Sequence, residues 1–570
     1  MLKRLNSRVL LWHRLICLSL LCLFFVYANL AFAAPLAVQG SADVGRILLP
    51  NQQLQAPKVT KTPIAPTLNA GQPTIRDTNQ PVFLLKKVVV KGNTVFTTCE
   101  LEPIYDAYIN KKVNISVASN IAALITQKYQ TAGYFLSLAY VENYNSKKGI
   151  VYINVVEGYI GQVELTDKLA NMPVLKAYIK KIINDRPIKT LSLESHLLRL
   201  NDLPGLSFRA VLMPLKAADQ GAVKLKLIPI RKISHGNITF DNFGSRFLGP
   251  NQVASAYGGH IFALTQTTLS GLSSLPTDEL KYGTLSHTMA IAPDFTLNMN
   301  GGITKANPGF SLKNFEIDSA AKSLSLNLKY QWIRQREKNL ALDLTLDTKN
   351  VASDILSTVL TREKTRVARL SATYNTIDSL NGVDIVNLTV SHGIAAFGAS
   401  QAGDLNLSRA QAKPSFAKAA IAASRLQNIT DTWALSTSLA GQYATEALYS
   451  SEEFGYGGQT FGRAYDSSEI TGDKGASAML ELRYNGWNAL DPISIQPYSY
   501  YDVGTAWNVD QGQAKRASGA SAGFGARLAT STQQSADIGV AWPLTRSVET
   551  PIYGANPQGP RLYLQVSQAF

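Results

Sequence analysis

The sequence predicts a membrane all-β barrel of about 16 antiparallel strands, preceded by two small α+β domains. Three observations predict this fold class. The first residues form an export signal, a strand–helix–helix–strand–strand pattern then occurs twice, and residues 232–570 alternate in hydrophobicity without a helical period. The composition agrees, because only 17% of the 570 residues are charged whereas glycine and tyrosine are abundant, at 40 and 24 residues.

Residues 1–33 are expected to be a signal peptide that is removed after export, since basic residues precede an apolar run and an A-x-A site. Its removal takes away four of the 55 basic residues and none of the 40 acidic ones, so the net charge falls from +15 to +11. Such a surplus suits anionic lipid headgroups or an acidic client, although solubility alone also explains it. Residues 34–82 are rich in proline and predict an extended linker, with one short helix over Ser41–Leu49 that Pro50 ends.

Residues 83–158 and 159–231 predict two consecutive α+β modules. In the first, a β-branched strand precedes two helical segments, "CELEPIYDAYIN" and "SVASNIAALITQKYQTAG", and two further strands follow. The same order returns in the second, and a repeat of roughly 75 residues predicts a jointed arm. Cys99 is the only cysteine left after signal removal, so an internal disulfide is excluded and we expect a buried, small apolar side chain.

Residues 232–570 predict the barrel. Their alternating segments of about ten residues are separated by turns rich in Asn, Asp, Gly and Ser, and tilted strands of 9 to 11 residues span an outer membrane. At roughly 20 residues per strand and connection, the region holds about 16 strands. A soluble β-sandwich is the alternative for any one segment, but in lipid every backbone amide must be paired, so the last strand must close against the first. One face of that last strand carries the expected C-terminal barrel signal, Leu562, Leu564, Val566 and Phe570.

Short motifs that follow one another along the chain carry a family resemblance. They are "KGNTVF", "VVEGYIG" and "LPGLSFRAVLMP" in the modules and "DNFGSRFLG" at the start of the barrel. Together with the signal, the linker, the two modules and the barrel, they resemble the two-partner secretion transporters, the TpsB or ShlB/FhaC/HecB-like haemolysin secretion/activation proteins. The resemblance spans essentially all of the mature chain. It implies that residues 83–158 are POTRA 1, that residues 159–231 are POTRA 2, and that both lie in the periplasm.

The glycine-rich stretch "FGYGGQTFGRAYD" raises the question of a nucleotide site. A phosphate-binding loop needs G-x-x-x-x-G-K-[ST] between a strand and a helix, and this stretch lacks that pattern. The superfamily resemblance instead implies a long sixth loop that folds back into the lumen, with a Val-Arg-Gly-Phe/Tyr motif at its tip. The matching residues are Gly462, Arg463, Ala464 and Tyr465. Gly462 and Ala464 depart from that motif, which leaves the geometry of the tip open.

A guanidinium inside a barrel needs an acceptor, because an unpaired charge away from bulk water is costly. The stretch "YYDVGTAW" resembles the family's aromatic-x-Asp-x-Gly motif on the barrel wall, with Tyr500, Asp502 and Gly504 as the matching residues. Asp502 is therefore the expected partner of Arg463. The alternative is that Arg463 is a solvated loop residue and Asp502 an ordinary carboxylate facing the lumen. The segments "GDKG" and "ELRYN" also match the strand that follows the loop.

The resemblance implies passive export of an unfolded, TpsA-like exoprotein, which the POTRA domains recognise in the periplasm and the barrel conducts without nucleotide hydrolysis. It also implies that the sixth loop and the Ser41–Leu49 helix close the pore at rest. We expect a monomer in the outer membrane, in contact with lipid and lipopolysaccharide, with no nucleic-acid partner.

No catalytic residue, metal or cofactor is expected, because the five mature histidines are isolated and none forms an HExxH motif or lies near a G-x-S-x-G motif. This disfavours an outer-membrane enzyme, and a diffusion porin would not need the modules. The alternative that stays open is an outer-membrane insertase of the same superfamily, although its BamA-like members usually carry five POTRA modules.

Overall fold

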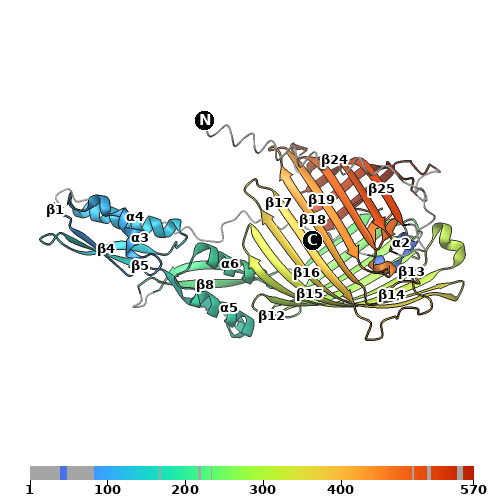
Figure 1. The fold of residues 1–570 in the computed structure, drawn as a ribbon, viewed down its shortest axis with the longest axis horizontal. Helices are drawn as coiled ribbons and strands as arrows, with labels where there is room; N and C mark the ends of the chain where they lie inside the picture. Colours follow the sequence, from blue (N-terminus) through green and yellow to red (C-terminus); the bar gives the residue numbers. More distant parts are fainter. Residues whose placement is uncertain are drawn as a thin grey trace.

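The computed structural model describes residues 39–47, 82–165, 168–215, 220–232, 234–490, 493–509, 515–548 and 556–570. Two small modules and a barrel follow one another along the long axis of the molecule (Figure 1). The predicted signal peptide and most of the predicted linker lie outside the described residues. Within them, no helix is both long enough and apolar enough to cross a membrane.

The first module is a three-stranded sheet covered by helices. Its sheet order is β2-β5-β4, with β2 and β5 parallel, and a two-stranded ladder of β1 and β3 lies beside it. The elements are β1 (Phe83–Leu84), β2 (Lys87–Lys91), α3 (Thr98–Leu101), the 3-10 turns η3 (Glu102–Ile104) and η4 (Asp106–Tyr108), β3 (Lys112–Val113), α4 (Ile115–Thr131), β4 (Leu138–Asn145) and β5 (Ile150–Val156).

Two expectations for this module were wrong. The predicted first helix is only a four-residue α3 followed by 3-10 turns, because Pro103 cannot donate the amide hydrogen bond that would continue an α-helix. Cys99 is exposed rather than buried, since Leu101 is the residue of α3 that enters the core.

Two of the motifs that carry the family resemblance meet in the first module. The Glu157 carboxylate of "VVEGYIG" accepts hydrogen bonds from the backbone amides of Thr94 (2.6 Å) and Val95 (2.8 Å) in "KGNTVF" and from the Tyr129 hydroxyl (2.7 Å). Burial alone would raise the pKa of Glu157, but these hydrogen bonds outweigh it and lower that pKa. The charged carboxylate therefore fixes the loop after β2 against the end of β5.

The second module repeats this plan. Its sheet order is β6-β8-β7, with β6 and β8 parallel, and two amphipathic helices cover one face. The core contains Tyr178, Ile182, Leu197 and Leu225. The elements are β6 (Tyr159–Leu165), η5 (Lys168–Asn171), α5 (Pro173–Asn184), α6 (Thr190–Asn201), β7 (Leu206–Pro214) and β8 (Ala222–Arg231).

All the remaining strands except β20 and β21 form a closed antiparallel barrel of 16 strands, when β22 and the short β23 that follows it are counted as one. This confirms the predicted fold class. The strands are β9 (His235–Asp241), β10 (Asn251–Gly259), β11 (Thr265–Leu275), β12 (Leu280–Ala292), β13 (Phe295–Ala306), β14 (Asp318–Arg334), β15 (Lys338–Ile355), β16 (Thr358–Ile377), β17 (Val383–Gly393), β18 (Ala417–Asn428), β19 (Trp433–Ala444), β22 (Lys474–Tyr484) with β23 (Trp487–Leu490), β24 (Ile493–Trp507), β25 (Arg516–Thr530), β26 (Gln534–Pro543) and β27 (Arg561–Ala569).

The last strand closes the barrel against the first. β27 pairs antiparallel with β9, from Gln565 opposite Asp241 to Ala569 opposite Asn237. On β27 the residues that were expected to share one face lie on the outer wall, with Leu562, Val566 and Phe570 exposed and Leu564 half-buried, whereas Tyr563 between them is buried. The alternation is that of a strand with one face toward lipid and the other toward the lumen.

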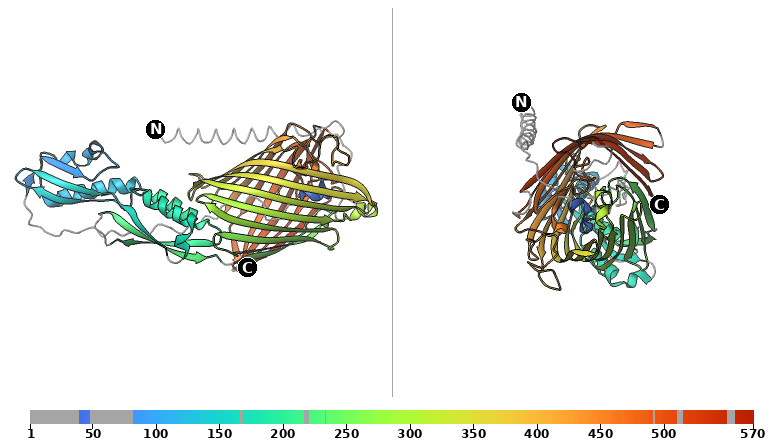
Figure 2. Two further views of the ribbon diagram at one scale, coloured as in Figure 1. Left: turned by 90° about the horizontal axis from the view of Figure 1, so that it is seen from below. Right: turned by 90° about the vertical axis from the view of Figure 1, so that its right-hand side faces the viewer.

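The second module docks on the turns at the near end of the barrel. Asp294, in the turn between β12 and β13, accepts hydrogen bonds from Lys181 (2.6 Å) and Arg199 (2.7 Å), and its own amide donates to the Tyr178 hydroxyl (2.8 Å). Leu264, in the turn between β10 and β11, is buried in the core of the module. These contacts hold the arm at one mouth of the barrel (Figure 2).

Candidate functional site

A long loop between β19 and β22 enters the barrel lumen. Residues 445–473 contain the 3-10 turn η7 (Ser450–Glu452) and a small hairpin of β20 (Phe454–Tyr456) and β21 (Ile470–Gly472). Tyr456 and Tyr465 of this loop are completely buried, in a cluster with residues of the barrel wall. The loop is therefore packed against the wall rather than solvated.

Glycines shape the loop where it turns toward its tip. Gly457 and Gly462 have φ values of +121° and +70°, which side chains with a Cβ rarely adopt. A Cβ on Gly462 would also lie 2.9 Å from the ring of Tyr456. This explains why glycine stands where the family motif has an apolar residue. Ala464 is buried and is not among the residues with a positive φ, so the second departure from the motif causes no strain there.

Arg463 at the loop tip contacts Glu481 of β22, and not the expected Asp502. Its Nη2 donates to Glu481 Oε2 at 2.9 Å, and its Nε donates to the Gln459 carbonyl at 3.1 Å. Arg463 is 7% exposed and Glu481 is fully buried. The expected pairing was therefore wrong, although the side chain is indeed buried and ion-paired rather than solvated.

Glu481 also accepts hydrogen bonds from two arginines of the barrel wall. Arg483 donates to its Oε1 at 2.7 Å, and Arg527 on β25 donates to its Oε2 at 3.0 Å. One carboxylate thus serves three guanidinium groups. The sequence did contain a signal for it, because Glu481 opens the "ELRYN" segment and lies in register with the lumen-facing residues of β22, where a lone acidic side chain needs a partner.

The predicted wall motif on β24 does lie against the loop, but through other contacts. The Asp502 carboxylate accepts from the hydroxyls of Tyr456 (2.6 Å) and Ser521 (2.9 Å). A Cβ on Gly504 would lie 2.1 Å from the Tyr456 ring, so glycine makes room for that tyrosine. Tyr500 places its ring 4.4 Å from the Arg463 guanidinium carbon, within the range of a cation–π contact. The motif therefore forms the seat of the loop.

The residues beyond the tip tie the loop to the strands that close the barrel. Tyr465 donates its hydroxyl to the Arg546 carbonyl at 2.8 Å, and its own carbonyl accepts from Arg561 of β27 at 2.7 Å. The Asp466 carboxylate pairs with Arg561 and with Arg246, which follows β9. The loop tip thus bridges the first and last strands from inside.

Residues 39–47 also lie inside the barrel, near the end away from the modules (Figure 1). They form α2 (Gln39–Ala42) and the 3-10 turn η1 (Val44–Arg46), so the helix is shorter and begins earlier than the expected Ser41–Leu49, whose last two residues lie outside the described residues. Val44 is buried among wall residues, and Lys349 of β15 donates to the Gly45 carbonyl at 2.7 Å.

The segment is bonded to the loop as well as to the wall. Arg46 donates to the Ser450 carbonyl at 2.5 Å and to the Glu453 carbonyl at 3.1 Å, and its guanidinium lies 3.6 Å from the Glu453 carboxylate. Asp43 accepts from the Ser450 hydroxyl at 2.7 Å. The two lumenal pieces therefore form one connected plug.

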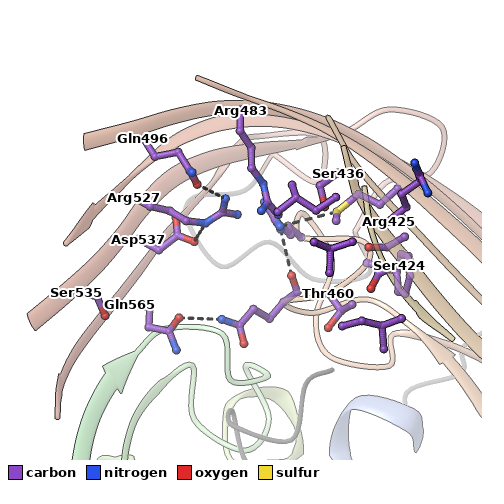
Figure 3. A pocket seen from close by; sticks show the side chains of 18 of the residues that line it. Ser424, Arg425, Ser436, Thr460, Arg483, Gln496, Arg527, Ser535, Asp537 and Gln565 are labelled. Carbon is purple, nitrogen blue, oxygen red and sulfur yellow. Dashed lines mark hydrogen bonds and ion pairs between the residues drawn. The ribbon is translucent and has the colours of Figure 1, made fainter. Parts of the chain in front are cut away.

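A cavity of about 830 Å³ lies beside the loop tip, toward the modules. Arg425, Arg463, Arg483 and Arg527 line it, together with one carboxylate, that of Asp537. Figure 3 shows the Arg527 side chain between Gln496 and Asp537. The lumen thus carries several arginines beside apolar side chains and holds open space on the side from which the arm approaches. No group of three or more His, Cys, Asp or Glu side chains able to hold a metal occurs in the described part of the chain.

Comparison with known protein families identifies the chain. The family model described as haemolysin secretion/activation protein ShlB/FhaC/HecB matches residues 221–526, which is more than half of the sequence. The chain belongs to this family. A second model, the ShlB-type POTRA domain, matches residues 83–158.

Relatives of the chain match it over most of their length. The outer membrane transporter CdiB of Dickeya dadantii is 21% identical over 480 residues, covering 82% of this chain and 83% of the relative. The heme/hemopexin transporter protein HuxB of Haemophilus influenzae is 22% identical over 486 residues, with 81% and 83% covered. The hemolysin transporter protein HpmB of Proteus mirabilis is 23% identical over 483 residues, with 80% and 79% covered.

Solved structures share the fold. CdiB from Escherichia coli superposes with a TM-score of 0.67 at 19% identity, covering 89% of this chain and 94% of CdiB. BamA from Haemophilus ducreyi lacking POTRA domains 1–3 gives a TM-score of 0.53 at 12% identity, with 86% and 100% covered. At these identities the likeness concerns the fold alone.

Proposed function

We propose that this protein exports one unfolded exoprotein across the outer membrane, receiving it on the periplasmic modules and conducting it through the barrel. The observation that carries the proposal is the content of the lumen. The chain's own loop and N-terminal segment lie in it, and the ion pairs and hydrogen bonds that hold them there can be exchanged. The names of the relatives CdiB, HuxB and HpmB, all transporters, agree with export.

The barrel lies in the outer membrane with its arm in the periplasm. Its outer wall exposes apolar side chains along β27 and its neighbours. A closed barrel pairs its backbone amides between strands, as crossing lipid requires. We propose that residues 159–231 are a second POTRA domain, because they repeat the sheet order and the helix pair of the first. We propose further that the protein acts as a monomer, since its barrel closes within one chain.

The modules offer open sheet edges for an extended client. In the described residues β4 and β7 each pair on one side only, and they expose Leu138 and Tyr140 on β4 and Val211 and Met213 on β7. An added strand bonds through its backbone and therefore tolerates many client sequences, which suits an unfolded ligand. We propose that the client adds to these edges before it enters the barrel.

Export would need no nucleotide hydrolysis. The sequence has no phosphate-binding loop, and folding of the client outside the cell would remove it from the population of chains that slide back. At rest the loop and residues 39–47 would block the lumen, since a barrel of 16 strands is otherwise wide enough for an aqueous channel.

A secretion assay tests this function. The client to examine is a large exoprotein with a signal peptide and a repetitive β-rich body encoded next to this gene. In cells that lack the transporter it should stay in the periplasm, and the wild-type transporter should restore its release. Secretion that continues without the transporter would contradict the proposal.

The matched variants are Arg463→Ala, in the loop, and Arg516→Ala, an exposed arginine at the rim of the outer wall that stacks on Trp507. Both remove one arginine from the barrel domain. We expect both to insert into the membrane, only Arg516→Ala to restore secretion, and Arg463→Ala to lose at least tenfold. Equal secretion by the two variants would exclude a role of the loop contact in export.

An insertase is the other function this fold supports. The structural likeness to BamA concerns the fold alone, and the chain shows two modules within the described residues. The two functions are separable, because loss of an insertase would deplete many outer-membrane barrels, whereas loss of a dedicated exporter should change the release of one client.

A further inference from the structure

Four lysines form a row on the outer wall of the barrel. Lys281 of β12 lies directly opposite Lys305 of β13, and Lys322 of β14 is paired with Ile303, two residues from Lys305. Lys322 and Lys364 of β16 both face the same residue, Asn350 of β15. All four are exposed. The yellow and green strands that face the viewer on the left of Figure 2 form this part of the wall.

The row lies immediately above the apolar band of the wall. On β13 the next outward residue below Lys305 is Ile303, 64% exposed, and on β14 the next below Lys322 is Leu324, 59% exposed. Two residues along a strand correspond to roughly 7 Å, less in height when the strand is tilted. Exposed leucine and isoleucine side chains mark the acyl region, so the ammonium groups lie at the level of the lipid headgroups.

The row belongs to the outer leaflet, because these strand ends point away from the periplasmic modules. The opposite ends of the same strands carry aromatic residues instead, with Phe295 stacked on Tyr330 at 4.7 Å and Trp332 exposed beside them. Aromatic belts are the usual marker of a bilayer interface. A row of four lysines at the outer interface is expected where that leaflet presents dense negative charge.

The positive charge of the row is not neutralised by carboxylates of the described residues. In the part of the chain that the structure describes, none of the four lysines forms an ion pair with a carboxylate, and the nearby Asp354 is taken by Arg362 at 2.6 Å. Elsewhere on the rim a cation finds an aromatic partner, as Lys474 does on Tyr443 at 4.3 Å. Like charges directly opposite each other, as Lys281 and Lys305 are, destabilise a sheet. An anion bound between them would remove that repulsion.

We propose that Lys281, Lys305, Lys322 and Lys364 form a binding site for the phosphate groups of a phosphorylated glycolipid of the outer leaflet, of the lipopolysaccharide class. The phosphates lie between the ammonium groups, and the acyl chains lie on the apolar band below. The site goes beyond the export function and does not depend on it, because it faces lipid and contributes no group to the lumen.

A ligand titration tests the site. The full chain without its signal is refolded into detergent micelles free of lipopolysaccharide, and the thermal unfolding midpoint of the barrel is followed as purified lipopolysaccharide is added. The variant combines Lys281→Gln, Lys305→Gln and Lys322→Gln. The matched control combines Lys111→Gln, Lys147→Gln and Lys148→Gln, three exposed lysines of the first module.

We expect the lysine-row variant to raise the half-saturating concentration by roughly tenfold to a hundredfold, since each basic residue near an anionic surface contributes about a factor of five. The control should bind as the wild type does. The same glycolipid without phosphates should bind as weakly to the wild type as the intact lipid does to the variant, and inorganic phosphate alone should cause no shift. Equal half-saturation for wild type and variant, or full binding of the dephosphorylated lipid, would overturn the proposal.

The wild type alone provides a second readout if the triple variant does not refold. Phosphate contacts are electrostatic, so sodium chloride from 50 to 500 mM should raise the half-saturating concentration at least tenfold. The variant Lys281→Arg with Lys305→Arg and Lys322→Arg keeps the charge and should bind as the wild type does. Binding that is insensitive to salt would show that only the apolar band holds the lipid, and a shift caused by inorganic phosphate would indicate a free-anion site.

Discussion

Glu481, and not Asp502, should control the release of the lumenal loop. Three variants separate the two carboxylates: Glu481→Gln, Arg463→Ala and Asp502→Asn. Each changes one polar group where the loop meets the barrel wall and leaves the backbone of the wall intact. The structure predicts a definite order of their effects, because the groups differ in how many charged partners they serve.

The free energy that each variant loses depends on which charged partners remain around the substituted group. Glu481→Gln leaves three guanidinium groups around a neutral amide, and removing one partner of a buried ion pair costs about 3–5 kcal/mol. Arg463→Ala removes one charged hydrogen bond while Glu481 keeps two arginines, which costs about 1.5–3 kcal/mol. Asp502→Asn keeps an oxygen that can accept from Tyr456, so about 0.5–1.5 kcal/mol is lost.

Hydrogen exchange of the backbone amides of residues 454–472 measures these losses. A tenfold faster exchange corresponds to about 1.4 kcal/mol of opening free energy. We expect exchange to accelerate by about a hundredfold or more in Glu481→Gln, by about tenfold to a hundredfold in Arg463→Ala, and by about tenfold at most in Asp502→Asn. Faster exchange in Asp502→Asn than in Glu481→Gln would refute the assignment of Glu481 as the partner of the loop.

Three further predictions concern the contacts around the plug. Gly504→Val should loosen the loop by about 1–3 kcal/mol, because its side chain would overlap the Tyr456 ring, whereas Gly301→Val, which faces open space, should not change loop exchange. Arg46→Ala should raise single-channel conductance, since it removes the bonds between the N-terminal segment and the loop; an unchanged value would reject a plugging role. Asp294→Asn should widen the distribution of distances between spin labels on the second module and the barrel. Burial raises the pKa of Asp294, but hydrogen bonds from two basic side chains lower it overall, so docking should stay constant from neutral pH down to about 3.8 and weaken below.

The barrel could be predicted from the sequence because the alternation of apolar and polar residues repeats along every strand. Each strand alternates between lipid and lumen, and the need to pair every amide in lipid fixes closure of β27 on β9. The two modules were visible for a similar reason, since their order of elements repeats. Periodic patterns depend on many residues, so single departures do not hide them.

The contacts inside the lumen could not be predicted in the same way. Arg463 lies close to both Asp502 and Glu481, and the choice between them depends on where the loop turns at Gly457 and Gly462, which no periodic pattern encodes. The predictions for the first helix and for Cys99 failed for a related reason. Pro103 decides where α3 ends, and Leu101 rather than Cys99 is the residue of that short helix that enters the core. Single residues that set local geometry are visible only in the folded chain.

An exporter must keep its barrel closed while the lumen is emptied. If a client displaces the loop, Asp466 leaves Arg246 and Arg561, and the seam between β9 and β27 loses its support from inside. The backbone ladder of β9 and β27 remains, and so do bonds at both of its ends that do not involve the loop. Asn242 bonds the Leu562 carbonyl at 3.0 Å and the Leu564 amide at 2.8 Å near one end of the seam, and Gly236 exchanges two backbone hydrogen bonds with Phe570 at the other. Phe570 therefore pairs with β9 at the end of the seam that lies farthest from the loop. This pairing would still hold the barrel closed after the loop has left the lumen.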